Sequence, residues 1–564
     1  MRNLMKRYAF LIIKIFLLAA FIVFVGLHTK SWNIVGLGLL EFIAIFCFQG
    51  LIPGKNRFLR VIKYLLTSLL LFLSLANLTV YLFSGTFVSY LMTSNTENLS
   101  AISSSIPLYV TAIVYIVIAA FFPMRLDFEQ VLPSIFEKMP KLIRNRYFFF
   151  TVLLAISLLI WIPTNLYGRL KTPVFAYTTY LHEAVKMSNL RSDNVSNKEL
   201  KAIEKEFRHE TIDSGINTPQ NSMNVIIVFA EGFSSEVMSY DGGKLTPQLN
   251  QFSAETDNFI NYFNQTAATY KGVRGQLFSS QQFDNGYENG SSKIKQNLET
   301  PLTSVQSILA DYGYQTEFFN PEPNAEVWAD YVSNLGFQKV LSSSTPSKAE
   351  ESYVDDQRNF QKLFSEAEKL NDSGQPFMLA TYTFGTHFSL DDSKTTYGDG
   401  KNALLNKFHN MDKSFGEFWS KFKKSELADN TMVIFTSDHA TFPDAQYRST
   451  FNTGRSYFLS TIPLMIYYPE IQPQTFDAKS RNTLGLAPTI LDLIGVSKAE
   501  NYFLGTSLYL DEPTSFEFIT DLSPAYYGTK DVTEQEVREN KDLTSQDVKT
   551  LDKLQDFYKL SLNE

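Results

Sequence analysis

The stretch NVIIVFAE, from Asn224 to Glu231, decides the fold that the sequence predicts. Apolar or small residues follow Asn224 without a break, and then a carboxylate appears. A short continuous apolar run is typical of a strand that is buried on both faces, as in a parallel α/β sheet. Ligands of such sheets bind beyond the carboxyl ends of the strands. Glu231 stands at that end, so we expect it to face a ligand.

The same pattern recurs twice later in the chain. TMVIFTSDH is an apolar run that ends in Asp438 and His439, and PFMLATYTFGTH ends in His387. Helical patterns such as LLNKFHNMDKSFGEFWSKFKK lie between these runs. The alternation of strands and helices predicts a mostly parallel sheet with helices on both faces, over residues 223–511. The charged residues 512–564 are predicted to close this domain.

The first third of the chain is apolar. It contains five stretches close to the ~20 residues that cross a bilayer as a helix, at about 8–27, 32–52, 64–83, 106–123 and 147–166. We therefore predict a five-span transmembrane domain over residues 1–167. Residues 168–222 are polar and include NKELKAIEKEFRHE, so they are predicted to form a helical connector.

Lysine and arginine residues set the predicted orientation, because they gather in cytoplasmic loops. The N-terminus and the loops around 55–63 and 125–146 are basic, whereas the loop at 84–105 has no Lys or Arg. The N-terminus is therefore predicted to be cytoplasmic, and the domain at 223–511 is predicted to be extracellular. The net charge is −8 with no basic run, which argues against a nucleic-acid partner. The single cysteine, Cys47, excludes an internal disulfide.

Glu231, Asp438 and His439 form a mixed oxygen and nitrogen ligand set. Such a set suits Mn²⁺, Mg²⁺ or Zn²⁺. A pair of adjacent Asp and His residues is weak evidence alone, and on that pair a purely structural role is about as plausible. Their position after an apolar strand, with Glu231 placed in the same way, favours a metal site.

The stretch NQTAATYKGVRGQLFSS provides a candidate nucleophile. Thr269 precedes a helical pattern and is predicted to be its N-cap. A helix N-terminus stabilises anions, and metal coordination activates a hydroxyl. Lys271 and Arg274 add positive charge for phosphoryl oxygens. Thr266 and Tyr270 are rival nucleophiles, and a simple capping role is the plainer reading of Thr269.

His387 follows a strand and is a candidate proton donor or phosphate ligand, although a loop histidine without a role is the plainer alternative. The remaining histidines lie in connector or helical contexts, and we assign no function to them: His28, His182, His209 and His409.

Taken together, these pieces resemble the lipoteichoic acid synthase family, membrane-anchored phosphoglycerol transferases of the sulfatase and alkaline phosphatase superfamily. The similar segments are the five apolar stretches, the outer loop YLFSGTFVSYLMTS, NVIIVFAEGFSSE, the segment with Thr269, TFGTHF, DNTMVIFTSDH, TLGLAPTILDLIGV and FLGTSLY. The resemblance implies a Mn²⁺-type site of Glu231, Thr269, Asp438 and His439. It also implies a threonine that takes glycerol phosphate from phosphatidylglycerol, and a cell-envelope glycan or teichoic acid acceptor.

Three departures qualify the resemblance. Asn320 stands where the synthases have a histidine, Trp328-Ala329-Asp330 replaces a Trp-x-Arg pattern that holds glycerol phosphate, and YKGVRG replaces an acidic pattern. An aspartate in place of an arginine weakens the binding of an anion. The alternatives are therefore a phosphoethanolamine transferase or a phosphodiesterase on the same scaffold. A sulfatase and a non-catalytic binding protein are less favoured, because Cys47 lies far from the nucleophile segment and all four expected ligands are present.

Overall fold

A computed structural model describes most of the chain. The described residues are 2–29, 31–52, 56–84, 87–88, 106–121, 145–167, 171–192, 196–216, 223–280, 302–322, 326–342, 353–387, 390, 393–455 and 459–511, with short pieces between 518 and 560. Most of the predicted loops at 84–105 and 125–146, and most of 512–564, lie outside them.

The chain divides into two compact units, and each is considered by itself. The first contains the N-terminal helices together with the segment Pro443–Ser456, and the second contains Ser188–Phe442 and Tyr457–Glu564. These units do not test the domain limits that the sequence predicts, so those limits remain predictions.

Five apolar helices in the first unit coincide with the five predicted stretches. They are α1 (Arg2–His28), α2 (Trp32–Leu51), α3 (Arg57–Ser84), α5 (Ile106–Phe121) and α7 (Arg146–Tyr167). Within the described residues, three segments are long and apolar enough to cross a membrane, namely Trp32–Leu51, Arg57–Phe83 and Tyr147–Leu166. The described apolar parts of α1 and α5 are shorter. Five spans and their orientation therefore stay a prediction.

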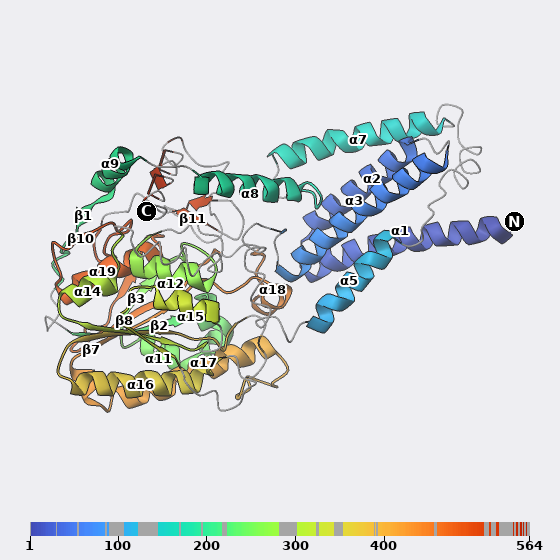
Figure 1. Cartoon of the computed structure of the whole chain (residues 1–564). Helices are drawn as coiled ribbons and strands as arrows, with labels where there is room; N and C mark the ends of the chain where they lie inside the picture. Colours follow the sequence, from blue (N-terminus) through green and yellow to red (C-terminus); the bar gives the residue numbers. More distant parts are fainter. Residues whose placement is uncertain are drawn as a thin grey trace. The chain divides into compact units, whose positions relative to one another are not determined.

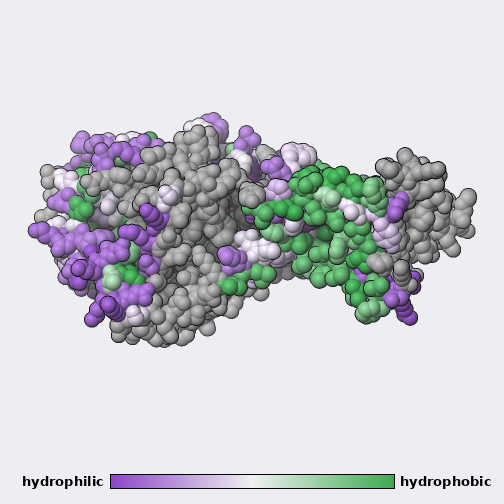
Figure 2. Space-filling view, turned by 90° about the horizontal axis from the view of Figure 1, so that it is seen from above, coloured by the Kyte–Doolittle hydropathy of each residue, from purple (hydrophilic) through white to green (hydrophobic). Residues whose placement is uncertain are grey.

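The surface of this helical unit is apolar. Side chains such as Phe16, Phe58 and Leu159 are 68, 71 and 74% exposed, and green apolar residues gather over the helices in Figure 2. An apolar surface of this kind suits lipid, because it exposes the groups that a soluble protein buries.

Inside the unit, the buried carboxylate of Glu41 accepts hydrogen bonds from the Ser74 hydroxyl (2.7 Å) and the Val174 amide (3.0 Å).

An eight-stranded sheet forms the centre of the second unit, in the order β5-β4-β6-β2-β7-β8-β3-β9. Its strands are β2 (Asn224–Ala230), β3 (Asp257–Ile260), β4 (Gln315–Asn320), β5 (Lys339–Ser342), β6 (Phe377–Tyr382), β7 (Thr431–Ser437), β8 (Leu464–Tyr467) and β9 (Thr475–Asp477). Every residue of β2, β6 and β7 is buried. These three strands pair in parallel, whereas β8 is antiparallel to both neighbours. The predicted mostly parallel sheet is confirmed.

Helices cover both faces of the sheet (Figure 1). One face carries α11 (Pro247–Ser253), α16 (Asp356–Asp372) and α17 (Ala403–Phe422), and the other carries α12 (Thr269–Phe278), α14 (Val305–Asp311), α15 (Glu326–Ser333) and α19 (Leu486–Ile494). Shorter elements are α10 (Glu236–Ser239), η2 (Tyr240–Gly243), η3 (Glu426–Asp429), α18 (Ala445–Phe451) and η4 (Thr483–Gly485). The apolar residues of α12, α14, α15 and α19 join those of the sheet in one continuous core.

The predicted connector is largely helical. It contains α8 (Ala176–Ser192) and α9 (Asn197–Phe207), followed by β1 (His209–Glu210), which pairs with β10 (Glu500–Asn501). Described residues near the C-terminus, Leu554, Phe557 and Leu560, pack in one apolar cluster with residues of α9. Two further short strands are β11 (Phe518–Thr520) and β12 (Tyr526–Gly528).

Candidate metal centre

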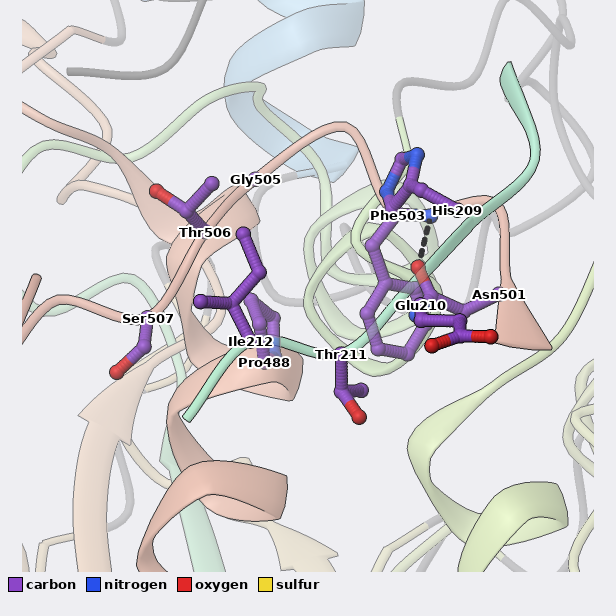
Figure 3. Close-up of a pocket in the computed structure, with 10 residues that line it drawn as sticks. All are labelled: His209, Glu210, Thr211, Ile212, Pro488, Asn501, Phe503, Gly505, Thr506 and Ser507. Carbon is purple, nitrogen blue, oxygen red and sulfur yellow. Dashed lines mark hydrogen bonds between the residues drawn. The ribbon is translucent and has the colours of Figure 1, made fainter. Parts of the chain in front are cut away.

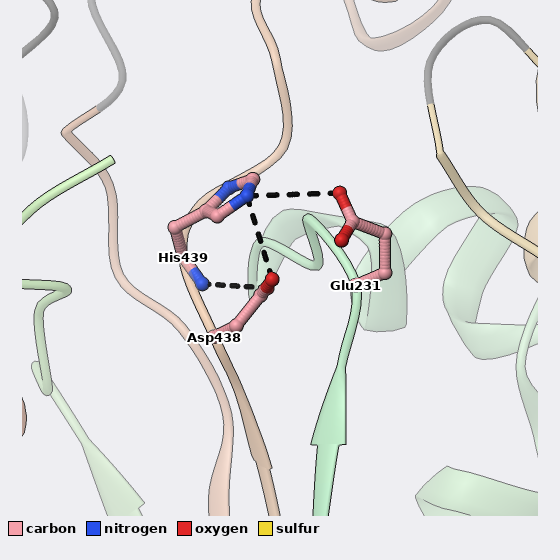
Figure 4. Close-up of side chains that lie close together, drawn as sticks. All are labelled: Glu231, Asp438 and His439. Carbon is pink, nitrogen blue, oxygen red and sulfur yellow. Dashed lines mark hydrogen bonds and ion pairs between the residues drawn. The ribbon is translucent and has the colours of Figure 1, made fainter. Parts of the chain in front are cut away.

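The register of the sheet brings the three predicted metal ligands together. Strands β2 and β7 are paired up to Ala230 opposite Ser437. The next residue of each strand, Glu231 and Asp438, therefore leaves the sheet at the same level. His439 follows, and one ligand atom from each of these three side chains lies within 4.8 Å of the others. Figure 4 shows the three side chains converging at the strand ends.

The hydrogen bonds of this group leave lone pairs facing one another. Asp438 Oδ1 accepts from the amides of Gly232 (2.8 Å) and His439 (2.7 Å), whereas the buried Oδ2 has no hydrogen-bond partner within the described part of the chain. His439 Nδ1 lies 2.8 Å from the Ala440 carbonyl, which only accepts, so Nδ1 carries the hydrogen. Nε2 then presents its lone pair to Glu231 Oε1 at 3.6 Å and to Asp438 Oδ2 at 3.5 Å.

Burial makes this arrangement costly without a cation. Glu231, Asp438 and His439 are only 4, 1 and 6% exposed. Burial raises the pKa of Glu231 well above its usual range, and the nearby charge of Asp438 raises it further. A divalent cation among the three side chains would offset both effects. The donor set therefore fits a divalent metal ion, and it is compatible with Mn²⁺, Mg²⁺ or Zn²⁺.

The hydroxyl of Thr269 joins the group. Its Oγ1 donates a 2.8 Å hydrogen bond to Glu231 Oε2. The predicted capping role is wrong by one residue, because Ala268 is the N-cap and Thr269 is the first residue of α12. Ala268 has φ +74°, a value that non-glycine residues seldom adopt. This turn directs the threonine hydroxyl to the carboxylate instead of to the helix amides.

Helix α12 approaches the end of β7 very closely. A Cβ placed on Gly272 would lie 2.0 Å from the carbonyl oxygen of Asp438, so only glycine permits this contact. Gln276 Nε2, one turn later, donates to the carbonyl of Ser437 at 2.9 Å. The helix that begins with the candidate nucleophile is therefore held directly on the strand that carries two candidate ligands.

The other candidates in this segment have different surroundings. The Tyr270 ring packs against Tyr331 at 5.9 Å, and Thr266 Oγ1 lies 3.5 Å from the Ala267 carbonyl. Lys271 Nζ lies 5.8 Å from the centre of the Tyr270 ring, and the Arg274 guanidinium lies 4.5 Å from that of Phe278. Both cations are buried. The Thr269 hydroxyl, for its part, bonds directly to the candidate ligand Glu231.

His387 lies within electrostatic range of the metal group. Burial lowers its pKa to about 3, and the positive charge of Lys407 acts in the same direction. Lys407 Nζ donates to the His387 carbonyl at 3.0 Å, and the His387 ring stacks on Phe384 at 5.0 Å. His387 is therefore neutral at physiological pH and suited to hydrogen bonding.

Asn320 and Trp328 belong to a buried network that also contains residues the sequence reasoning missed. Trp328 Nε1 donates to the Tyr382 hydroxyl at 2.6 Å, and this hydroxyl lies 2.6 Å from Glu322 Oε1 and 3.2 Å from Asn320 Oδ1. Burial raises the pKa of Glu322 to about 7. The charge of Glu322 also raises the pKa of Glu231, which places it near the metal group. The sequence signal that could have identified Glu322 is its position just after the buried strand β4. Asp330, in contrast, is exposed.

Two threonines after β6 position Glu231. Thr383 Oγ1 accepts the Glu231 amide at 3.0 Å, and Thr386 Oγ1 donates to the Glu231 carbonyl at 2.6 Å. Both threonines belong to the segment TFGTH, which follows β6. The placement of polar residues just after buried strands would therefore have identified them in the sequence.

A small cavity lies elsewhere in this unit. It has a volume of about 30 Å³ and is lined by residues of β1, β10 and α19, including His209, Pro488 and Asn501 (Figure 3). That volume is about that of one water molecule. The cavity shares no residue with the metal group, and it is too small for a substrate.

This unit is similar in sequence to several known proteins. Residues 223–496 match the family model described as sulfatase. Lipoteichoic acid synthase 2 of Bacillus subtilis (strain 168) is 24% identical over 368 residues, which cover 59% of this chain and 56% of that protein. Phosphoglycerol transferase I of Citrobacter koseri is 23% identical over 300 residues, which cover 49% and 38%.

The chain thus spans about half the length of the curated relatives it matches. Among solved structures, lipoteichoic acid synthase LtaP from Listeria monocytogenes has 18% identity and a TM-score of 0.47. That match covers 65% of this chain and 97% of LtaP.

Proposed function

We propose that the chain is a membrane-anchored, metal-dependent phosphoglycerol transferase, and the match of residues 223–496 to the sulfatase family model supports this proposal. It takes glycerol phosphate from a membrane phospholipid, phosphatidylglycerol, and passes it to a cell-envelope glycan or polyglycerol-phosphate acceptor outside the cell. The names of the relatives, lipoteichoic acid synthase and phosphoglycerol transferase, support this class of reaction. The observation that carries the proposal is the Thr269 hydroxyl, 2.8 Å from Glu231 within a buried group of metal-type ligands.

In the proposed reaction Thr269 is the nucleophile. Glu231, Asp438, His439 and Thr269 would hold the metal ion, Mn²⁺ or alternatively Mg²⁺ or Zn²⁺. When bound, such an ion lowers the pKa of a coordinated hydroxyl and neutralises phosphoryl oxygens.

The transfer then takes place in two stages. Thr269 Oγ1 attacks the phosphorus, the bond from phosphorus to the diacylglycerol oxygen breaks, and that oxygen takes a proton. An acceptor hydroxyl next attacks the same phosphorus, the bond from phosphorus to Thr269 Oγ1 breaks, and the proton of the acceptor passes to Oγ1. The Thr269 proton leaves along its hydrogen bond to Glu231 Oε2.

Other residues of the chain bind and orient the transferred group. His387, neutral and close to His439, donates a hydrogen bond to the phosphoryl group. Lys271 and Arg274 contribute positive potential from the first turns of α12. Trp328 and Asn320 border the site through the network around Tyr382.

The acidic surroundings favour a second candidate, a phosphoethanolamine transferase. Glu322 places a further carboxylate close enough to raise the pKa of Glu231. A carboxylate attracts the ammonium of an ethanolamine head group and gives a glycerol head group no such advantage. The metal ligands and the threonine would serve both reactions. A phosphodiesterase results if water replaces the acceptor hydroxyl.

The deciding experiment follows diacylglycerol. The purified full chain is incubated with Mn²⁺ and fluorescent phosphatidylglycerol or phosphatidylethanolamine, beside Thr269→Ala and Thr269→Ser variants. We expect release from phosphatidylglycerol that falls at least 100-fold in Thr269→Ala and returns in part with Thr269→Ser. Release from phosphatidylethanolamine alone would establish the second candidate. No release from either lipid by metal-loaded protein would contradict both.

Metal content provides an independent test. Glu231→Ala and Asp438→Ala are expected to lose bound Mn²⁺, because each removes one of the converging ligands. Glu426→Ala, which removes an exposed carboxylate before the opposite end of β7, is the matched control and should keep the metal. Wild-type metal content in both alanine variants would refute the assignment.

A further inference from the structure

An arginine in the first unit is buried without a hydrogen-bond partner for its charge. Arg448 of α18 is 1% exposed, and among the described residues its three guanidinium nitrogens, Nε, Nη1 and Nη2, have no hydrogen-bond partner. A guanidinium carries five N–H donors and stays charged at physiological pH. Burying such a group unpaired is costly. The site therefore requires an acceptor of hydrogen bonds that carries negative charge.

The charged groups around Arg448 do not supply this acceptor. Arg455 and Asp444 both act on it electrostatically, together with Tyr81 of α3. The Asp444 side chain caps α18 by accepting the Tyr447 amide at 2.7 Å. Arg455 is itself buried, with its guanidinium 5.2 Å from the Tyr447 ring. Among the described residues, the groups that act on Arg448 are therefore one carboxylate, one tyrosine and a second arginine.

This place lies at one end of the candidate membrane spans. Tyr81 is near the last residue of α3, and its hydroxyl bonds to Ser31, the residue before α2. The end of α3 and the start of α2 therefore meet here, and α18 packs on α3. Trp32, 64% exposed, marks the same end, as tryptophans do at the boundary between lipid and water. Phospholipid phosphates lie at that depth of a bilayer.

We propose that Arg448 binds a phosphate group at this end of the helical unit, beside Tyr81 and Arg455. The planar fork of arginine binds two oxygens of one phosphate, and the tyrosine hydroxyl adds a donor. The phosphate comes from a phospholipid head group or from free phosphate. The inference does not rest on the proposed transferase activity, because none of these residues belongs to the metal group.

The test measures binding by the thermal unfolding of the full chain in detergent. The probes are short-chain phosphatidylglycerol and, separately, sodium phosphate. Arg448→Met removes the charge at similar volume, and Arg448→Lys keeps the charge without the fork. Arg60→Gln is the matched control, because Arg60 lies near the other end of α3 and is exposed.

We expect the probe to raise the unfolding temperature of the wild type and of Arg60→Gln. The apparent Kd should weaken at least tenfold in Arg448→Met and by less in Arg448→Lys. A response to the lipid alone identifies a head group, and an equal response to phosphate identifies the free ion. Without either probe, Arg448→Met should be at least as stable as the wild type, because an unpaired charge has gone.

Two results would overturn the proposal. One is a wild-type protein that responds to neither probe, and the other is Arg448→Met with an undiminished response. Because binding is the readout, a Thr269→Ala protein should respond as the wild type does. Failure of this inference would therefore be distinguishable from failure of the transferase proposal.

Discussion

Replacing Gly272 by alanine is expected to damage the metal centre through the backbone of α12. The new Cβ would lie 2.0 Å from the carbonyl oxygen of Asp438, whereas ordinary contact begins at 3.4 Å. Helix and strand end must therefore separate by 3.4 − 2.0 = 1.4 Å along this contact. The obstacle is backbone, so no change of side-chain rotamer relieves it. The shift carries Thr269 away from Glu231 and Asp438.

The magnitude follows from two opposing effects. Alanine in a helix interior favours folding by about 1 kcal/mol relative to glycine, and overpacking a core costs about 1–3 kcal/mol. The net loss of stability is thus at most about 2 kcal/mol, and the protein should fold. The site suffers more, because a misplacement of about 1 Å reduces catalysis by a factor of about 100.

Calorimetric Mn²⁺ titration and diacylglycerol release would be measured on the full chain. Gly416→Ala in α17 is the matched control, because its Cβ would also overlap neighbouring atoms, those of Gln248 at 2.5–2.9 Å, at a place outside the candidate metal group. We expect Gly272→Ala to lose at least tenfold in Mn²⁺ affinity and about 100-fold in release, with Gly416→Ala unchanged in both. A Gly272→Ala protein with wild-type affinity and release would refute the close approach of α12 to the metal ligands.

Two further predictions concern acidity and topology. Glu322 has a pKa of about 7 against an ordinary 4.5, so its contribution to stability is complete below pH 4.5 and is lost as pH rises through 7. This difference in pKa corresponds to about 3 kcal/mol of unfolding free energy. The Glu322→Gln variant should lose less stability than the wild type between pH 5 and pH 8, as measured by unfolding of the metal-free proteins. An equal change of unfolding free energy in both proteins would contradict the prediction. Ser239 is exposed, whereas the sole cysteine, Cys47, is buried. Ser239→Cys should therefore react with an impermeant maleimide on intact cells while the wild type does not, and labelling only after lysis would reverse the predicted orientation.

The sequence alone predicted the central strands and the candidate metal ligands at their ends. Strands β2, β6 and β7 are buried on both faces, so their apolar runs are continuous and their ends are visible as the first polar residues. Parallel strands present their carboxyl ends at one edge, which is why Glu231, Asp438 and His439 meet there. The apolar stretches of the first unit were equally visible, because length and hydropathy are properties of the chain itself.

Only the tertiary structure decided which groups contact one another around those ends. Thr269 and Glu231 are 38 residues apart, and Tyr382 and Glu322 are 60 apart. No local pattern records such a distance, so the shift of Thr269 from cap to first helical residue and the role of Glu322 were not foreseen. Arg448 reads in the sequence as an ordinary surface arginine. Its burial arises from packing against an element far away in the chain, and packing depends on shape, which a linear pattern of residue types does not contain.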